Sequence, residues 1–185
     1  MPSAVSKKTY HHGDLRTAAI ETGLALLESR KVIDVGLREI ARTVGVSATA
    51  LYRHFPDKDA LLYALAAEGR HRLAVAQQIA EDSAGGGKAG FSATGAAYVR
   101  FALANPALFR LIFIGGSKLG DESGDEAMRL LMHNARTVTG ITGEDARIVA
   151  ARAWSMAHGL AMLILDGQLP ADDDLIDSVV DASHL

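Results

Sequence analysis

The chain has 185 residues, of which 49% are hydrophobic and 22% are charged, and its formal net charge is −3. The apolar fraction excludes wholesale disorder, and the length fits one compact domain or a small domain joined to a moderate one. The charge is unevenly spread: residues 1–72 hold 11 Lys and Arg against 8 Asp and Glu, and residues 73–185 hold 8 against 14. A basic N-terminal part on an acidic body favours nucleic-acid binding at one end.

Several classes of site are excluded by residue type. The chain has no cysteine, which excludes disulfides, thiolate metal sites and a cysteine nucleophile. Its 7 histidines form no metal-binding array such as H-E-x-x-H, so we expect neither a metal nor a cofactor. No apolar stretch follows Lys7 and Lys8 as in a signal peptide, and 153–165 is too short for a membrane span. We therefore expect a cytoplasmic protein without a membrane partner.

The first half of the chain predicts helices separated by capping residues. Ala and Leu are frequent, only 4 prolines occur, and no segment alternates as a strand does, so we expect an all-α fold of about nine helices. Ser, Asp and Asn are favoured where a helix begins, and glycine where it ends. The elements expected here are a flexible basic arm at 1–12 and helices over 14–29, 37–44, 48–54 and about 57–81.

The second half predicts a helical body. A glycine-rich stretch at 83–90 matches G-x-G-x-x-G, but it follows a helix rather than a strand, so we interpret it as a loop. Further helices are expected over 91–104, from Asn105-Pro106 onward, and over 125–139, 144–165 and 172–182. The predicted organisation is an arm at 1–12, a helix-turn-helix domain at 13–56, and a regulatory and dimerisation domain at 57–185.

The stretch LREIARTVGVSATALYRHF, residues 37–55, has the spacing of a helix-turn-helix. Ile40, Ala41 and Leu51 can pack the two helices against each other, and Ala41 is small where they cross. Gly45 suits the left-handed conformation of the turn. The N-terminal end of the second helix is then free to enter the major groove of DNA.

The outward residues of this motif are the candidate DNA-binding residues. Thr49 can hydrogen-bond a base edge, and a methyl group of Ala48 or Thr49 can contact a thymine methyl. Tyr52, His54 and Lys58 can contact phosphates. Lys7 and Lys8 are either a solvated tail or an arm that contacts the minor groove. The full candidate set is Lys7, Lys8, Arg38, Ser47, Ala48, Thr49, Tyr52, Arg53, His54 and Lys58.

Residues 14–65 resemble the DNA-binding domain of the TetR family of bacterial regulators. The string GVSATALYRHFPDKDALL is highly specific for that family. Trp154, His158 and Gly159, within WSMAHGLAMLILDG, resemble a large subgroup named for a Trp-His-Gly signature in its C-terminal domain. One position departs from the family pattern: Gly36 stands where members usually carry Thr or Ser, so we expect no side-chain contact there and assign that role to Arg38.

The resemblance implies a homodimer that binds double-stranded DNA and responds to a small molecule. The last two long helices would form the dimer interface, and an effector bound in the body would alter the spacing of the two DNA-binding heads. The sequence is compatible with this, because residues 148–165 are apolar nearly all round and need cover on two sides. The two heads of such a dimer would bind a pseudo-palindromic operator.

Aromatic and methionine side chains of the body are the candidates for an effector pocket. Apolar cavities between helices bind small hydrophobic or aromatic molecules, and methionines adapt to their shape. The same side chains could equally form the core, and His158 could be a buried packing histidine rather than a polar anchor. The candidate set is Tyr98, Phe101, Phe109, Phe113, Met128, Met132, Trp154 and His158.

The sequence favours a transcriptional repressor over an enzyme. No G-x-S-x-G nucleophile elbow appears, and no carboxylate pair is placed for acid–base work. The alternatives that stay open are an activator of the same fold, a regulator triggered by a protein, and a helical dimerisation module that does not bind DNA.

Overall fold

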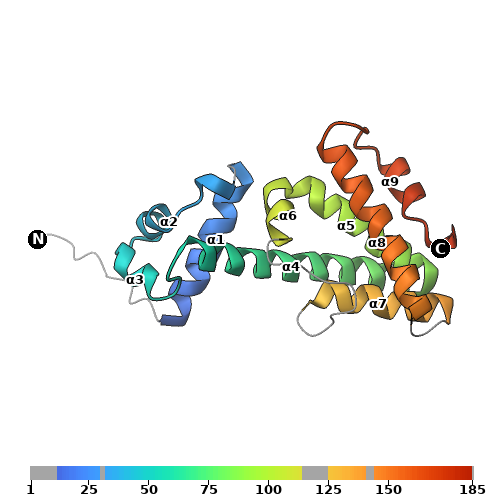
Figure 1. Cartoon of the computed structure of the whole chain (residues 1–185), viewed down its shortest axis with the longest axis horizontal. Helices are drawn as coiled ribbons and strands as arrows, with labels where there is room; N and C mark the ends of the chain where they lie inside the picture. The colour runs from blue at the N-terminus through green and yellow to red at the C-terminus, as the bar shows by residue number, and fades with distance from the viewer. Residues whose placement is uncertain (1–11, 30–31, 114–124, 141–143, 185) are drawn as a thin grey trace, which may run out of the picture. The chain divides into compact units, whose positions relative to one another are not determined.

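The computed structural model describes residues 12–29, 32–113, 125–140 and 144–184 (Figure 1). Within these ranges the chain forms nine α-helices and no strand, as the composition predicted. The chain divides into two compact units, Met1–Leu65 and Ala66–Leu185. The expected arm at 1–12 lies outside the described residues except for His12, where the first helix begins.

The first unit is a three-helix cluster followed by the start of a fourth helix. Its elements are α1 (His12–Ser29), a 3₁₀ turn (Val32–Asp34), α2 (Leu37–Val44), α3 (Ala48–Tyr52) and the beginning of α4 (Lys58–Ser83). Helices α1, α2 and α3 contact one another pairwise. The side chains at the centre of this cluster are almost fully buried: Ile40, Ala41, Leu51, Phe55 and Leu61. This core fixes the angle between α2 and α3.

The second unit is a helical body in which α5 is central. It comprises the rest of α4 with α5 (Gly87–Ala104), α6 (Pro106–Ile112), α7 (Glu126–Thr139), α8 (Glu144–Leu165), α9 (Asp173–Val179) and a closing 3₁₀ turn (Ala182–His184). Helix α5 contacts α6, α7, α8 and α9, and α7 packs on α8 (Figure 1). One part of the body's core joins α5, α7 and α8 through Phe91, Met132, Ala135, Val149 and Ala150.

Capping residues explain where several helices begin. The Asp125 carboxylate accepts a hydrogen bond from the backbone N–H of Met128 at 3.1 Å, and the Asp172 carboxylate accepts one from Leu175 at 2.7 Å. Pro106 occupies the first turn of α6, where no backbone N–H is needed. The final helix ends at Val179, three residues before the predicted end, and the chain closes in a 3₁₀ turn instead.

The loop between α4 and α5 is shorter than the loop predicted at 83–90, because α5 already begins at Gly87. Gly86 has a φ of 73°, a left-handed conformation that reverses the chain between α4 and α5. At Gly90 a Cβ atom would lie 3.0 Å from Cγ of Glu81, so the two helix ends approach closely. The glycines therefore serve a tight helical hairpin, and the phosphate-binding motif that they resemble has no strand beside it.

Candidate nucleic-acid interface and ligand cavity

The turn between α2 and α3 is built by the residues that the motif predicted. Gly45 has a φ of 82° and ends α2, and its N–H donates to the Ala41 carbonyl at 3.0 Å. The Val46 N–H donates to the same carbonyl at 2.9 Å. The Ser47 hydroxyl then accepts a hydrogen bond from the backbone N–H of Ala50 at 3.2 Å, which caps α3. Local hydrogen bonds thus hold the helix-turn-helix.

The surface of α3 that faces away from the core carries the polar side chains. Leu51 and Phe55 point inward and are 0% and 1% exposed, whereas Tyr52 is 42% exposed. Thr49 and Arg53 are also exposed, and Ala48 and His54 are half-buried. Because Leu51 and Phe55 are buried on one side of the helix, the side chains on its opposite side point outward. These exposed side chains are available to a binding partner.

A surface hollow brings residues from three elements beside Tyr52. Arg38 of α2 and Lys58 at the start of α4 line this hollow together with Tyr52 and Gly36. We give the name α3 surface to five exposed residues, Arg38, Ser47, Thr49, Tyr52 and Arg53, together with the half-buried Lys58. The Asp57 carboxylate accepts a hydrogen bond from the backbone N–H of Ala60 at 2.8 Å, which caps the start of α4 beside this hollow. Lys7 and Lys8 lie outside the described residues.

Gly36 is the N-cap of α2, and it provides no side-chain hydrogen bond to the helix. Its backbone is extended, with a φ of −139°, which any residue adopts. A Cβ atom placed there would meet nothing within 4 Å. The position has room for the Ser or Thr that the resemblance leads one to expect, so the glycine is not required by packing.

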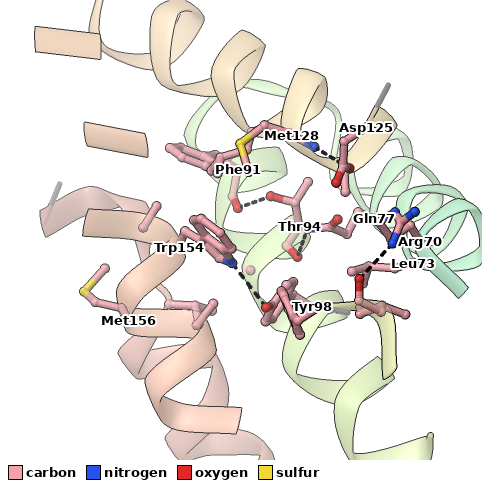
Figure 2. A pocket seen from close by; sticks show the side chains of 18 residues that line it. Arg70, Leu73, Gln77, Phe91, Thr94, Tyr98, Asp125, Met128, Trp154 and Met156 are labelled. Atoms are coloured by element: carbon pink, nitrogen blue, oxygen red, sulfur yellow. Dashed lines mark hydrogen bonds between the residues drawn. The ribbon is translucent and has the colours of Figure 1, made fainter. Parts of the chain in front are cut away.

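The second candidate site is a cavity of about 60 Å³ inside the body (Figure 2). Its walls come from α4, α5, α7 and α8, with contributions from Ile112, Phe113 and Val180. Four of the predicted effector residues line it: Tyr98, Phe113, Met128 and Trp154. The sequence analysis did not identify the other polar lining residues, which are Arg70, Gln77, Thr94 and Asp125.

The remaining predicted effector residues lie outside the walls of this cavity. Phe109 is 0% exposed and packs edge-on against Tyr98 and Phe113, with ring centroids 5.4 and 5.3 Å away. Met132 is 1% exposed and belongs to the core with Phe91 and Val149. Phe101 is half-buried on α5. His158 is half-buried and does not line the cavity, and its Nδ1 lies 2.8 Å from the hydroxyl of the lining residue Tyr98.

A chain of hydrogen bonds joins three of the predicted residues. The indole Nε1 of Trp154 donates to the Tyr98 hydroxyl at 3.2 Å, and that hydroxyl lies 2.8 Å from Nδ1 of His158. Burial lowers the pKa of His158, which favours the neutral ring. With the hydrogen of the neutral ring assigned to Nε2, Nδ1 accepts, and the Tyr98 hydroxyl donates to it. Burial also raises the pKa of the Tyr98 hydroxyl, which keeps it protonated.

Two signals in the sequence were available for the missed polar residues. Arg70, Leu73 and Gln77 recur at helical spacing along α4, so they share one face with a buried leucine. A glutamine on a buried face is unusual and marks a site that needs a partner. Thr94 and Asp125 gave no such signal, because each is also explained locally: Thr94 bonds the Phe91 carbonyl, and Asp125 caps α7.

Other features of the described residues point to no further chemistry. No group of three His, Asp or Glu side chains among the described residues is placed to hold a metal ion. Helix α8 has one segment, Asp145–Leu165, that is long and apolar enough to cross a membrane by length and composition alone. A helix-turn-helix unit followed by a helical body is the architecture of a class of DNA-binding transcriptional regulators.

Comparison with known families identifies that class more closely. Residues 19–65 match the family described as "Bacterial regulatory proteins, tetR family", and residues 91–183 match the "Tetracyclin repressor-like, C-terminal domain". The chain therefore belongs to the TetR family of transcriptional regulators, as the sequence motif predicted. No protein with a curated description matches the chain.

Solved structures share the fold over almost the whole chain. A protein of unknown function from Rhodococcus sp. RHA1 is 34% identical, with a TM-score of 0.78 over 96% of this chain and 95% of that one. A TetR-family regulator from Streptomyces coelicolor is 22% identical, with a TM-score of 0.66 over 91% and 78%. The flavonoid-responsive regulator FrrA is 21% identical, with a TM-score of 0.59 over 93% and 94%.

Proposed function

We propose that this TetR-family regulator is a repressor that binds a pseudo-palindromic operator as a homodimer and is released by a small molecule. The exposed α3 surface carries the proposal, because it presents Thr49, Tyr52 and Arg53 on a helix whose opposite side is fully buried. The functional parts would be the basic arm at 1–12, the DNA-binding domain at 13–56 and the regulatory and dimerisation domain at 57–185. A regulator of this kind acts on DNA in the cytoplasm.

Different residues of the α3 surface would have different roles on DNA. Thr49, with Ala48 beside it, lies at the N-terminal end of α3, which enters the major groove in helix-turn-helix proteins. These two residues would select the sequence, with Arg53 following along the groove. Arg38, Ser47, Tyr52, His54 and Lys58 would contact phosphates and set the orientation. Lys7 and Lys8 would add charge near the minor groove.

The dimer would form through α7 and α8. One side of α8 is uncovered in the single chain, and Ile148 and Leu163 on it are 45% and 46% exposed. Arg152 and Ser155 continue this side, and a Cβ atom added at Gly159 would meet nothing within 4 Å. The small residues Ser155 and Gly159 in the middle of this side allow close approach of a second helix, and a partner α8 is the cover that a two-fold dimer supplies.

The effector would bind in the α4–α8 cavity. A cavity of about 60 Å³ is smaller than the roughly 150 Å³ that hold a benzene molecule in a protein core, so a ring-sized effector must displace wall side chains. Met128 and Leu131 are the adaptable walls on α7. Helix α4 begins at Lys58, a residue of the α3 surface, and supplies Arg70 and Gln77 to the cavity. An effector that moves α4 would therefore also move Lys58.

The Trp-His-Gly signature gains a structural interpretation from this cavity. Trp154 lines the cavity, His158 holds the Tyr98 hydroxyl, and Gly159 lies on the uncovered side of α8. One short segment of α8 would thus serve both the effector site and the dimer. We propose on this basis that the chain belongs to the subgroup named for the signature, with a hydrophobic or aromatic effector.

Selection of genomic DNA fragments by the purified protein, followed by sequencing at two salt concentrations, tests the proposal. We expect a shared pseudo-palindrome and a steep loss of affinity at the higher salt, because phosphate contacts release counterions. Thr49→Ala should relax the recovered sequence, and the control change Ser83→Ala, at an exposed position at the end of α4, should not. Recovery of no shared sequence from ligand-stripped protein would contradict the proposal, and sites upstream of promoters would show an activator.

The dimer interface has its own test. Gly159→Arg places a long charged side chain on the uncovered side of α8, where it meets nothing in the single chain. We expect the variant to sediment as a folded monomer and to lose operator binding, whereas Ala104→Arg, at an exposed position of α5, should remain dimeric. A Gly159→Arg dimer of unchanged stability would place the interface elsewhere.

A further inference from the structure

Three side chains with a single hydrogen to donate line the cavity, and each donates it inside the protein. Trp154 donates its indole N–H to Tyr98, and the Tyr98 hydroxyl donates to His158. The Thr94 hydroxyl donates to the Phe91 carbonyl at 2.7 Å. An indole N–H and a hydroxyl each have one hydrogen to give, so these three side chains have none left for a ligand. Figure 2 shows the first and last of these bonds along the wall.

Gln77 differs from these three side chains, because its amide oxygen has no hydrogen-bond donor within the part of the chain that the structure describes. Its side chain is 8% exposed, lines the cavity, and donates from Nε2 to the Thr94 carbonyl at 3.2 Å (Figure 2). A carbonyl oxygen only accepts, so this bond fixes which end of the amide is nitrogen. The amide oxygen Oε1 is buried and finds no donor among the described residues. A buried acceptor left unpaired has lost its hydrogen bonds to water, and a ligand that donates to it restores one.

The charged wall residues do not select an ionic ligand. Arg70 donates from Nη1 to the Ile112 carbonyl at 2.8 Å, and Asp125 lies in the same wall with the opposite charge. The other lining side chains are mainly apolar, so an ion would lose its hydration without a matched partner. The wall therefore suits an uncharged molecule.

We infer that the effector is a small, uncharged, largely apolar ring compound whose hydroxyl or N–H group donates a hydrogen bond to the Gln77 amide oxygen. The inference rests on the proposed effector function of the cavity and specifies its chemistry. Simple phenols and neutral heteroaromatic N–H compounds belong to this class. Their methyl ethers and N-methyl derivatives, which have the same rings without the donor, do not.

Three ring-matched probes test the inference on the unmodified full-length protein. The probes are 4-ethylphenol, its methyl ether 4-ethylanisole, and 4-ethylbenzoate, and calorimetry measures their dissociation constants. The intensity of Trp154, the single tryptophan of the chain, reports whether each probe reaches the cavity. We expect 4-ethylphenol to bind about tenfold more tightly than 4-ethylanisole, because one satisfied buried acceptor corresponds to about that factor. The benzoate should bind most weakly.

Gln77→Met assigns the preference to the amide. Methionine fills a similar volume and has no amide oxygen, so the tenfold ratio between phenol and ether should fall to about one. The matched control is Gln78→Met on the next residue, which is exposed and bonded to Asp82, and it should keep the ratio. The comparison of probes on the unmodified protein stands even if Gln77→Met does not fold.

Each contrary outcome has a distinct meaning. Equal binding of phenol and ether, or a ratio that survives Gln77→Met, would overturn the inference and leave the effector cavity in place. Tightest binding of the benzoate would also overturn it, because Arg70 would then select the ligand. Binding of none of the three probes would overturn the inference together with the proposed effector site.

Discussion

The two candidate sites of this regulator are built on opposite principles. The α3 surface displays its functional groups to solvent, and Tyr52 is 42% exposed, while the residues that position it, Leu51 and Phe55, are buried. In the cavity the functional groups are themselves buried and are bonded to one another, as Tyr98 is to Trp154 and His158. The first site presents exposed side chains to a partner, and the second holds most of its polar side chains in internal bonds.

This difference separates binding from stability. An exposed side chain of the α3 surface such as Thr49 or Tyr52 contributes little to the folded state, so its removal should affect DNA binding alone. A cavity side chain takes part in the core, so its removal should affect stability first and effector response second. The predictions below use this contrast, beginning with the largest expected effect.

Tyr98→Phe should give the largest change in stability. The substitution deletes a hydroxyl that accepts from Trp154 and donates to His158, leaving both partners without it in a half-buried setting. We expect the free energy of unfolding to fall by about 2 kcal/mol, with operator affinity unchanged. Denaturant unfolding measures this, with Tyr63→Phe as control because Tyr63 is 53% exposed. Equal unfolding midpoints for the two variants would show that the hydrogen-bond chain is dispensable.

Tyr52→Ala should weaken operator binding and leave the stability of the protein unchanged. The side chain stands in the hollow with Arg38 and Lys58 and makes no contribution to the core. We expect operator affinity to fall about tenfold, near 1.4 kcal/mol, without loss of thermal stability. Fluorescence anisotropy of a labelled operator measures the affinity, and Tyr63→Ala is the matched exposed tyrosine. An unchanged affinity would remove Tyr52 from the DNA contacts.

Gly36→Thr should strengthen both properties slightly. The position is an N-cap with extended backbone and open space around its Cβ, so threonine can cap α2 without strain. We expect a gain of about 0.2 kcal/mol in unfolding free energy and tighter operator binding if the hydroxyl reaches a phosphate. The control Gly36→Ala supplies a Cβ but no cap. A threonine variant no better than the alanine variant would contradict the capping role.

Mild acid should produce the smallest effect. Burial lowers the pKa of His158 below its ordinary value of 6.5, so the unfolded chain takes up this proton at higher pH than the folded chain. The contribution of neutral His158 to the free energy of unfolding is thus fully present at neutral pH. It is lost as the pH falls below 6.5 toward the pKa of His158 in the folded chain. His158→Gln should flatten this part of the stability profile, and exposed His133→Gln should not. Parallel profiles for both variants would contradict the assignment.

The contrast also explains how much could be predicted from sequence. The α3 surface comes from one continuous stretch in which caps, a turn glycine and buried positions follow local rules, so Ser47, Gly45 and Leu51 have the predicted structural roles. The cavity is assembled from helices distant in sequence, and only some of the aromatic candidates line it. Phe109 and Met132 have the same residue types as the lining, and tertiary packing alone decides that they belong to the core.

The boundaries of the elements show the same division. Capped starts such as Asp125 and Asp172 were predicted, because the signal is one residue. The start of α5 at Gly87 was missed, since glycine is a poor helix former and the reason for it lies in the close approach of Gly90 to Glu81. Local chemistry can be predicted from the chain, and long-range proximity comes from the folded structure.

The central claim is that occupation of the cavity controls DNA binding, and a cavity-filling variant tests it most directly. Ala153 lines the cavity, and leucine there would occupy much of the space of about 60 Å³. Anisotropy of a labelled operator should show that 4-ethylphenol releases the unmodified protein and the control Ala151→Leu, while Ala153→Leu binds the operator but is not released. Release of Ala153→Leu at the same 4-ethylphenol concentration as the unmodified protein would contradict the account.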